Sequence, residues 1–169
     1  MEATKMDLTS NGNQNGTNDL QEENVDEVTQ KNLTFTIGDE IFGIQIENVT
    51  QIIGIQHITY IPNQADYVKG VINLRGQIIP VMEVRTKFKK PVIDYDDRTC
   101  IIVVSKDEIT VGLIVDRVSE VLNIKESEIS ATPTFNKKER VEYIKGIAHV
   151  NEDIIMLLDM DKMLDIEKE

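Results

Sequence analysis

The stretch KGVINLRGQIIPVMEVRTKF, residues 69–88, returns in altered form as KGIAHVNEDIIMLLDMDKML, residues 145–164. The two stretches align without gaps, and each contains two apolar runs separated by a polar turn. A second pair, GIQIENVTQII at 43–53 and GLIVDRVSEVL at 112–122, repeats in the same order. Segments that recur in order predict two half-domains that share one topology.

The residues around these repeats have the spacing of short strands. Leu33, Phe35 and Ile37 alternate with threonines, and a Gly-Asp-Glu turn leads to a further alternating run, which predicts a β-hairpin. Residues 46–53 carry apolar side chains at helical spacing, so we expect a short amphipathic helix there. The segment MDKMLD predicts a final helical piece.

Many short strands with short connections favour a mainly β fold of two small barrels or rolled sheets packed against each other. Each half has about 60 to 70 residues, close to the lower limit for an independent core, so we expect an apolar layer shared between the halves. Such a layer reaches the surface as a groove, and grooves between subdomains are common binding sites.

Charge and composition exclude several classes of function. The chain has 169 residues and a net charge of −12, from 30 acidic and 18 basic residues, which argues against a nucleic-acid or anionic membrane partner. Residues 1–31 are polar and acidic without a sustained period, and we expect a disordered tail. Residues 32–165 would then form one domain of two interleaved barrels, and residues 166–169 a flexible end. Because no long uncharged apolar run occurs, we expect a cytoplasmic protein without membrane insertion.

The sequence has no motif for catalysis or metal binding. Cys100 is the single cysteine, and His57 and His149 have no Cys or His neighbours at ligand spacing. No nucleophile with a neighbouring base and no glycine-rich phosphate loop is present. We therefore expect no enzyme activity, no metal and no cofactor.

The NLRG turn, residues 73–76, allows two interpretations. In the repeat, the positions of Asn73, Arg75 and Gly76 hold His149, Asn151 and Glu152. Arg75 and Gly76 can be a plain turn, with Gly76 at positive φ and Arg75 in solvent. Alternatively, Arg75 is a forked donor for a partner's carboxylate. The repeat alone does not decide between them.

Together these stretches resemble the family of bacterial chemotaxis coupling proteins, the CheW-like proteins, from about residue 33 to residue 164. The NLRG turn with its following apolar strand, and the run GLIVDRVSEVL, are specific in combination. The resemblance implies two SH3-like five-stranded β-barrel subdomains, with short helices between strands and at the C-terminus.

The resemblance also implies an adaptor rather than an enzyme. Such proteins bind the cytoplasmic tip of methyl-accepting chemoreceptors and the regulatory domain of the histidine kinase CheA, and so join both into arrays at the inner face of the membrane. By motif match, the expected receptor contacts are Val49, Gln51, Gly70, Asn73, Arg75, Gly76 and Val121.

One departure from the family concerns the charge next to Arg75. Family members often carry Glu at the position of Gln51, where it can pair with the arginine. If residues 46–53 are helical, Glu47 shares a face with Gln51 and could replace the missing carboxylate.

Two alternatives remain at this point: a CheW-like scaffold outside chemotaxis, and a small-ligand-binding barrel that uses the groove. A ligand site would be closed, with several convergent polar groups, whereas an adaptor would present an open apolar strip with a charged rim.

Overall fold

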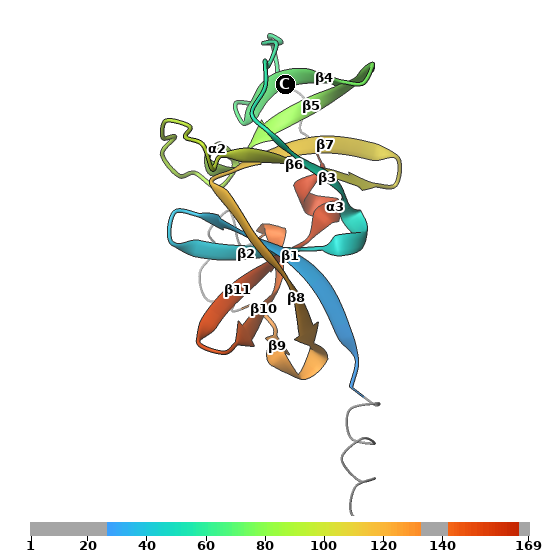
Figure 1. Ribbon diagram of the computed structural model, residues 1–169, viewed down its shortest axis with the longest axis vertical. Coiled ribbons are helices and arrows are strands. Elements are labelled where there is room, and N and C mark those ends of the chain that lie inside the picture. The colour runs from blue at the N-terminus through green and yellow to red at the C-terminus, as the bar shows by residue number, and fades with distance from the viewer. Residues whose placement is uncertain (1–26, 133–141, 166–169) are drawn as a thin grey trace, which may run out of the picture.

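The computed structural model describes residues 27–132 and 142–165 of the chain, and it is mainly β (Figure 1). The elements, in chain order, are β1 (Thr29–Ile37), β2 (Glu40–Gln45), η3 (Ile46–Asn48), β3 (Val49–Gly54), β4 (Val68–Leu74), β5 (Gln77–Glu83), α2 (Val84–Lys87), β6 (Cys100–Lys106), β7 (Ile109–Val115), β8 (Arg117–Lys125), η4 (Glu126–Glu128), β9 (Ile129–Ser130), β10 (Ile144–Val150), β11 (Asp153–Leu158) and α3 (Met160–Met163).

The strands form two sheets, and each sheet takes strands from both repeats. Barrel A has the order β8-β1-β2-β11-β10-β9, and barrel B has the order β3-β6-β7-β5-β4. The hairpin β1–β2 therefore lies with the last strands of the chain, and the hairpin β6–β7 lies with β3, β4 and β5. Each barrel consists of the hairpin of one repeat and the remaining strands of the other. The five expected strands are present in each barrel, and barrel A has a sixth, the two-residue strand β9.

The two repeats have matching detail. Strands β4 and β10 show the same alternation of buried and exposed residues. Each has a register irregularity at its second residue, between Val68 and Gly70 in one and between Ile144 and Gly146 in the other. The following strands also pair alike, because β5 runs parallel to β7 and β11 runs parallel to β2. The internal symmetry predicted from the sequence is therefore present in the backbone.

Both sheets close on themselves through the segments that follow an edge strand. After β3, the chain crosses to β4, where Thr59 and Val71 exchange two backbone hydrogen bonds of 2.9 Å. After β8, the turn η4 leads directly to β9 at the opposite edge of barrel A. These connections cover part of the open edges that could otherwise pair with other chains.

An apolar layer between the barrels is the largest core cluster among the described residues. Phe35 and Phe42 come from barrel A, Met82 and Leu113 come from barrel B, and all four are fully buried. Phe88, just after α2, packs against Phe42 with the rings tilted and their centroids 5.2 Å apart. Each barrel also has a smaller core of its own. The layer shared by the two halves holds them in one body.

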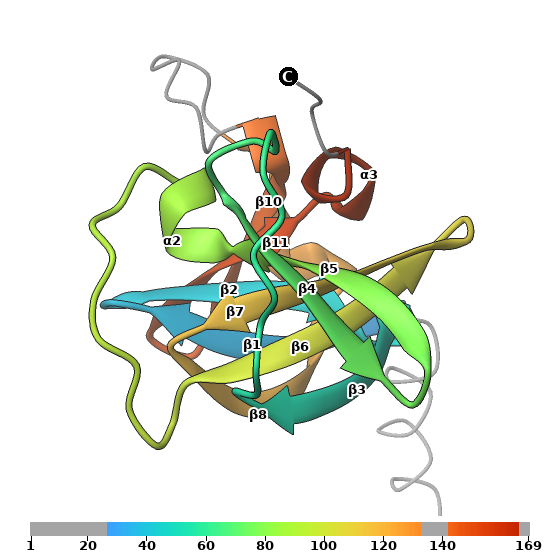
Figure 2. The same cartoon turned by 90° about the horizontal axis from the view of Figure 1, so that it is seen from above.

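The two ends of this layer carry different elements. The helix α2 and the β1–β2 turn lie at the left in Figure 1 and in the view from above in Figure 2, whereas the β4–β5 and β6–β7 turns lie at the right in both. We call these the α2 end and the hairpin end.

The expected helix at 46–53 is wrong. Only Ile46–Asn48 form a turn of 3-10 helix, and from Val49 the chain is the strand β3, with alternating half-buried and exposed residues. Thr50, Ile52 and Ile53 are β-branched, a class that favours strands. Over so short a segment, apolar residues three apart fit a strand edge as well as a helix face.

The domain boundaries need one adjustment. Strand β1 begins at Thr29, inside the expected tail of residues 1–31, and pairs there with Lys125 of β8. Residues 1–26 of that tail and the expected flexible end at 166–169 lie outside the described residues. The expected final helical piece is confirmed as α3.

Within residues 27–132 and 142–165, no helix has the length and apolar character needed to cross a membrane.

Candidate functional site

The NLRG turn forms the tip of the β4–β5 hairpin, at the hairpin end. Leu74 pairs with Gln77, which leaves Arg75 and Gly76 as a two-residue connection with φ of 55° and 87°. Positive φ at both central residues is typical of the tight turns that match strand twist. The side-chain oxygen of Asn73 accepts a hydrogen bond of 2.8 Å from the backbone N–H of Gly76. Asn73 and Gly76 therefore close the turn without help from the side chain of Arg75.

Arg75 is a costly residue for this backbone position. A left-handed conformation costs a non-glycine residue about 1–2 kcal/mol, and asparagine adopts it more readily. The repeat has Asn151 at the equivalent place with φ of 56°. Arg75 is exposed, and its side chain makes no hydrogen bond or ion pair with any residue that the structure describes. The turn does not require arginine, which favours the interpretation that Arg75 contacts a partner.

Gly70 has a structural role that the sequence did not show. It is buried, with φ of 151°, and a Cβ there would collide with the backbone carbonyl of Thr59. Thr59 is the residue that closes barrel B against Val71. Gly70 therefore permits closure of the barrel, and it lies on β4, the strand that leads to the NLRG turn.

The remaining expected contacts lie on two edge strands. Val49 and Gln51 are half-buried on β3, an edge strand of barrel B. Val121 is 48% exposed on β8, an edge strand of barrel A. The segment after β3 runs beside the NLRG turn, because the side chain of Gln56 donates to the carbonyl of Asn73 at 3.4 Å. The turn is therefore a neighbour of the chain that continues β3.

Ile52 is a further candidate that residue-by-residue motif matching missed. It is 45% exposed on β3 and is the repeat equivalent of Val121, which is exposed to a similar extent. The inner valines Val49 and Val118 are also equivalent, and both pack partly against the central layer. The repeat alignment contained this signal. We call Val49, Gln51, Ile52, Asn73, Arg75, Gly76 and Val121 the candidate clasp.

The expected pairing of Glu47 with Arg75 loses its geometric basis. Glu47 lies in η3 and Gln51 in β3, so the two residues do not share a helix face. Neither side chain forms a hydrogen bond or ion pair with Arg75 in the described part of the chain. The pairing stays a prediction for the bound state only.

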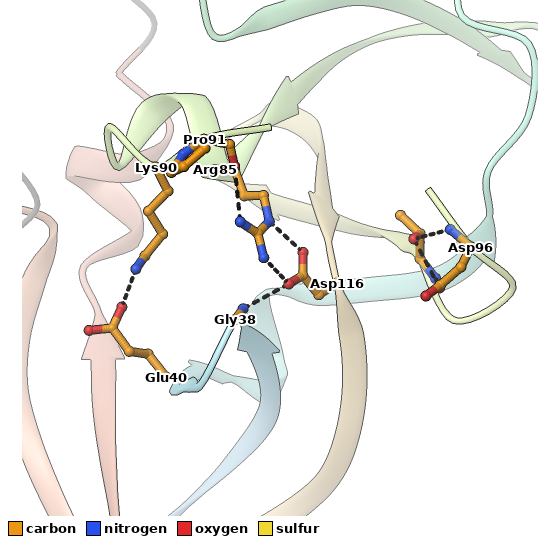
Figure 3. Close-up of polar contacts among 8 residues, drawn as sticks. Gly38, Glu40, Arg85, Lys90, Pro91, Asp96 and Asp116 are labelled. Atoms are coloured by element: carbon orange, nitrogen blue, oxygen red, sulfur yellow. Dashed lines mark hydrogen bonds and ion pairs between the residues drawn. The ribbon is translucent and has the colours of Figure 1, made fainter. Parts of the chain in front are cut away.

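A part-buried ion pair joins the two barrels at the α2 end (Figure 3). Arg85 of α2 donates from Nε and Nη2 to the two carboxylate oxygens of Asp116, at 2.9 and 2.6 Å. Asp116 also accepts from the backbone N–H of Gly38 at 2.7 Å. Burial acts to raise the pKa of Asp116, but the hydrogen bonds from Arg85 and Gly38 outweigh it, and the pKa lies below its usual value. Sequence reasoning missed this pair.

A second buried carboxylate lies where β5 meets α2. Glu83 is 3% exposed and accepts a hydrogen bond from the hydroxyl of Tyr95. Burial raises the pKa of Glu83, although the bond from Tyr95 and the charge of Lys69 act in the opposite direction. Burial and the contact with Glu83 raise the pKa of Tyr95 as well.

Residues 31–168 match the CheW-like domain family. The chain belongs to this family. Chemotaxis protein CheW from Klebsiella aerogenes is 38% identical over 141 residues, which cover 83% of this chain and 85% of that protein. Chemotaxis protein CheW from Bacillus subtilis is 31% identical over 138 residues, covering 82% and 88%.

A solved structure of the family has the same fold. The scaffolding protein TtCheW from Thermoanaerobacter tengcongensis superimposes with a TM-score of 0.73 at 30% identity, covering 78% of this chain and 90% of that chain. The CheW-like relatives are thus named as chemotaxis and scaffolding proteins. The resemblance and the mainly β two-barrel fold expected from the sequence are confirmed.

The CheW-like domain has a pocket, but the candidate clasp does not line it. A pocket of about 750 Å³ lies beside α2, lined by residues 63–67, Thr86, Lys87, Lys89, Glu142 and Tyr143. Lys87 lies over the ring of Tyr67, 3.8 Å from its centroid, and near that of Tyr143. Among the described residues, no three His, Cys, Asp or Glu side chains are grouped to hold a metal ion. Because the candidate clasp does not line this pocket, the pocket does not support a small-ligand site at the clasp.

Proposed function

We propose that this chain is a chemotaxis adaptor that joins the cytoplasmic tips of chemoreceptors to the regulatory domain of the histidine kinase CheA. The family, the named relatives and the two-barrel fold support a scaffold in chemotaxis. The adaptor works without catalysis, in the cytoplasm, in arrays beneath the membrane.

The observation that carries the receptor part of this proposal is the conformation of Arg75. The chain holds a long, forked cation in a left-handed turn, exposed and without a partner among the described residues, where its own repeat uses asparagine. A guanidinium group binds a carboxylate with two parallel hydrogen bonds, and such charged bonds are about twice as strong as neutral ones. We therefore assign a carboxylate on the receptor helix as the partner of Arg75.

Apolar residues of the candidate clasp provide the rest of the receptor contact. Ile52 is exposed on β3 of barrel B, Val121 is exposed on β8 of barrel A, and Val49 is half-buried. An amphipathic helix binds apolar side chains of this kind through its own side chains three and four residues apart. The receptor tip is a helical hairpin, so one of its helices supplies both the apolar face and the carboxylate.

The kinase binds a different surface, so that both partners are held by one body. The large apolar layer between the barrels holds them together as one body. A single body that contacts both partners couples them because each partner restricts the orientation of the other.

Assembly of a ternary complex tests this proposal. The receptor tip hairpin, the kinase regulatory domain and this chain are mixed in pairs and all together, and the complexes are measured by analytical ultracentrifugation. We expect this chain to bind each partner singly. We expect the receptor tip and the kinase regulatory domain to sediment together only when this chain is present. Competition between the two partners for this chain would contradict the adaptor function.

A further inference from the structure

The Arg85–Asp116 pair is a latch that connects three segments of the two barrels. Gly38 lies in the turn between β1 and β2 of barrel A, Arg85 follows β5 of barrel B, and Asp116 is the single residue between β7 and β8. Arg85 also donates from Nη1 to the carbonyl of Pro91, at 2.9 Å. The side chains of Arg85 and Asp116 are 11% and 22% exposed. A two-pronged ion pair shielded from water in this way restricts orientation far more than a surface pair does.

The latch connects directly to the strands that carry the candidate clasp. Asp116 immediately precedes β8, which carries Val121. Arg85 lies in α2, which immediately follows β5, and the other end of β5 is the NLRG turn with Arg75. The strands β8 and β5 therefore lead away from this ion pair at the α2 end, β8 to Val121 and β5 to the NLRG turn (Figure 1).

Within residues 27–132 and 142–165, the hairpin end has no equivalent of this latch. The repeat counterpart of Arg85 is Asp161, which pairs with Lys106 through one contact of 3.3 Å. These two side chains are 65% and 37% exposed, so water and salt weaken their attraction. The barrels are thus held firmly by charge at the α2 end and weakly by charge at the hairpin end.

We propose that Arg85 and Asp116 are positioning residues for receptor binding, which fix the separation between Val121 on one barrel and Arg75 on the other. This inference rests on the proposed function, because it concerns the receptor site. The receptor helix must touch both barrels at once. If the latch opens, the barrels sample several orientations, and only a fraction of the molecules has the orientation that fits the receptor helix. The apparent Kd for the receptor then rises to the intrinsic Kd divided by that fraction.

The test measures affinity and inter-barrel geometry in the same variants. Asp116→Asn, Arg85→Gln and the double variant are titrated with the receptor tip hairpin at a temperature where each is fully folded. We expect each single variant to bind about fivefold more weakly or worse, and the double variant to bind no more weakly than the weaker single one. Additive losses in the double variant would overturn the latch.

Two control variants separate positioning from general stability. Ile155→Val removes a methylene from the separate core of barrel A and lowers stability without touching the latch. Asp161→Asn breaks the exposed ion pair between the same two barrels. We expect both controls to keep the affinity of the natural sequence. An affinity loss in Ile155→Val equal to that of Asp116→Asn would show a merely structural effect and overturn the inference.

A measurement without any partner keeps this test separate from the proposed function. Spin labels are placed on cysteines introduced at Asn123 and Gln77, exposed residues two positions from Val121 and from Arg75, in a Cys100→Ala background. We expect Asp116→Asn to broaden the distribution of label distances. Failure of the natural sequence to bind the receptor tip would overturn the proposed function. Label distances that Asp116→Asn does not broaden would overturn the latch, whether or not the receptor tip binds. Broadened distances with unchanged receptor affinity would also contradict the positioning role.

Discussion

Arg75 and Asn151 occupy the same position in two equivalent hairpin turns, with φ of 55° and 56°. Asparagine suits this left-handed conformation, and arginine does not. Asn151 shows that the first position of such a turn does not need arginine, although the second positions differ, since φ is 87° at Gly76 and is not positive at Glu152.

Replacing Arg75 with asparagine should therefore separate stability from binding. We expect Arg75→Asn to leave the free energy of unfolding unchanged or slightly higher, and to weaken receptor-tip binding about tenfold, because a bond to a charged group contributes about 1.5–3 kcal/mol. Urea unfolding and a binding isotherm measure the two quantities. The control Asn151→Arg, in the equivalent turn, should lose a little stability and no receptor affinity. Unchanged binding by Arg75→Asn would refute the role of Arg75.

The glycines of barrel B should respond to alanine very differently. We expect Gly70→Ala to lose more than about 3 kcal/mol or to fail to fold, because both its φ and the carbonyl of Thr59 oppose a side chain. Gly76→Ala should lose about 1–2 kcal/mol, since only its φ is unfavourable. Gly54→Ala, where nothing lies within 4 Å, should change stability by less than about 0.5 kcal/mol. Equal losses for all three would contradict this account of barrel closure.

The Arg85–Asp116 pair should make stability depend on pH. The folded state lowers the pKa of Asp116 below the ordinary value of 3.8. Its contribution is therefore complete above that value and is lost as the pH falls through the lower, folded pKa. We expect Asp116→Asn to be less stable than the natural sequence by about 1–3 kcal/mol at pH 7, and the difference to shrink below pH 4. Thermal unfolding across this range measures it, and a difference that does not vary with pH would contradict the ion pair.

Glu83 should show the opposite dependence. The folded state raises its pKa above the ordinary value of 4.5, so its contribution to stability is present below that value and is lost as the pH rises through the folded pKa. Glu83→Gln keeps an acceptor for Tyr95 without a buried charge. We expect this variant to be more stable than the natural sequence at pH 7, with the gain absent below about pH 4.5. A variant less stable at neutral pH would show that the carboxylate itself is required.

The exposed apolar residues should contribute to binding more than to folding. We expect Ile52→Ser to weaken receptor-tip binding severalfold and to change the free energy of unfolding by less than about 1 kcal/mol, because this side chain is 45% exposed. Ile154→Ser, on the β10–β11 hairpin, removes a similarly exposed isoleucine and is the control. Equal effects of the two variants on receptor binding would place the receptor elsewhere.

The repeats predicted the symmetry of the fold but not its connections. The alignment of residues 69–88 with 145–164 predicted that β4–β5 and β10–β11 would match, and they do in strand register and in the positive φ of the first turn residue. Nothing in the alignment says that each hairpin joins the barrel of the other repeat. That exchange is visible only in the strand order of the two sheets.

The exchange also explains which site residues were missed. Arg85 and Asp116 lie 31 residues apart, in different repeats, and meet because β7 lies beside β5. The role of Gly70 depends in the same way on the approach of Thr59. The NLRG turn, in contrast, could be read from local residues, because a two-residue turn depends on its own sequence. The error at 46–53 arose because eight residues are too few for apolar spacing to distinguish a strand from a helix.

The most direct test of the account is a titration of isotopically labelled chain with a receptor signalling-tip hairpin, following each backbone amide by NMR. We expect the largest shifts at Ile52, Arg75, Gly76 and Val121, on both barrels at once, and their loss in Arg75→Asn. Shifts confined to the pocket beside α2, or no shifts at saturating receptor tip, would contradict the adaptor function and the candidate clasp together.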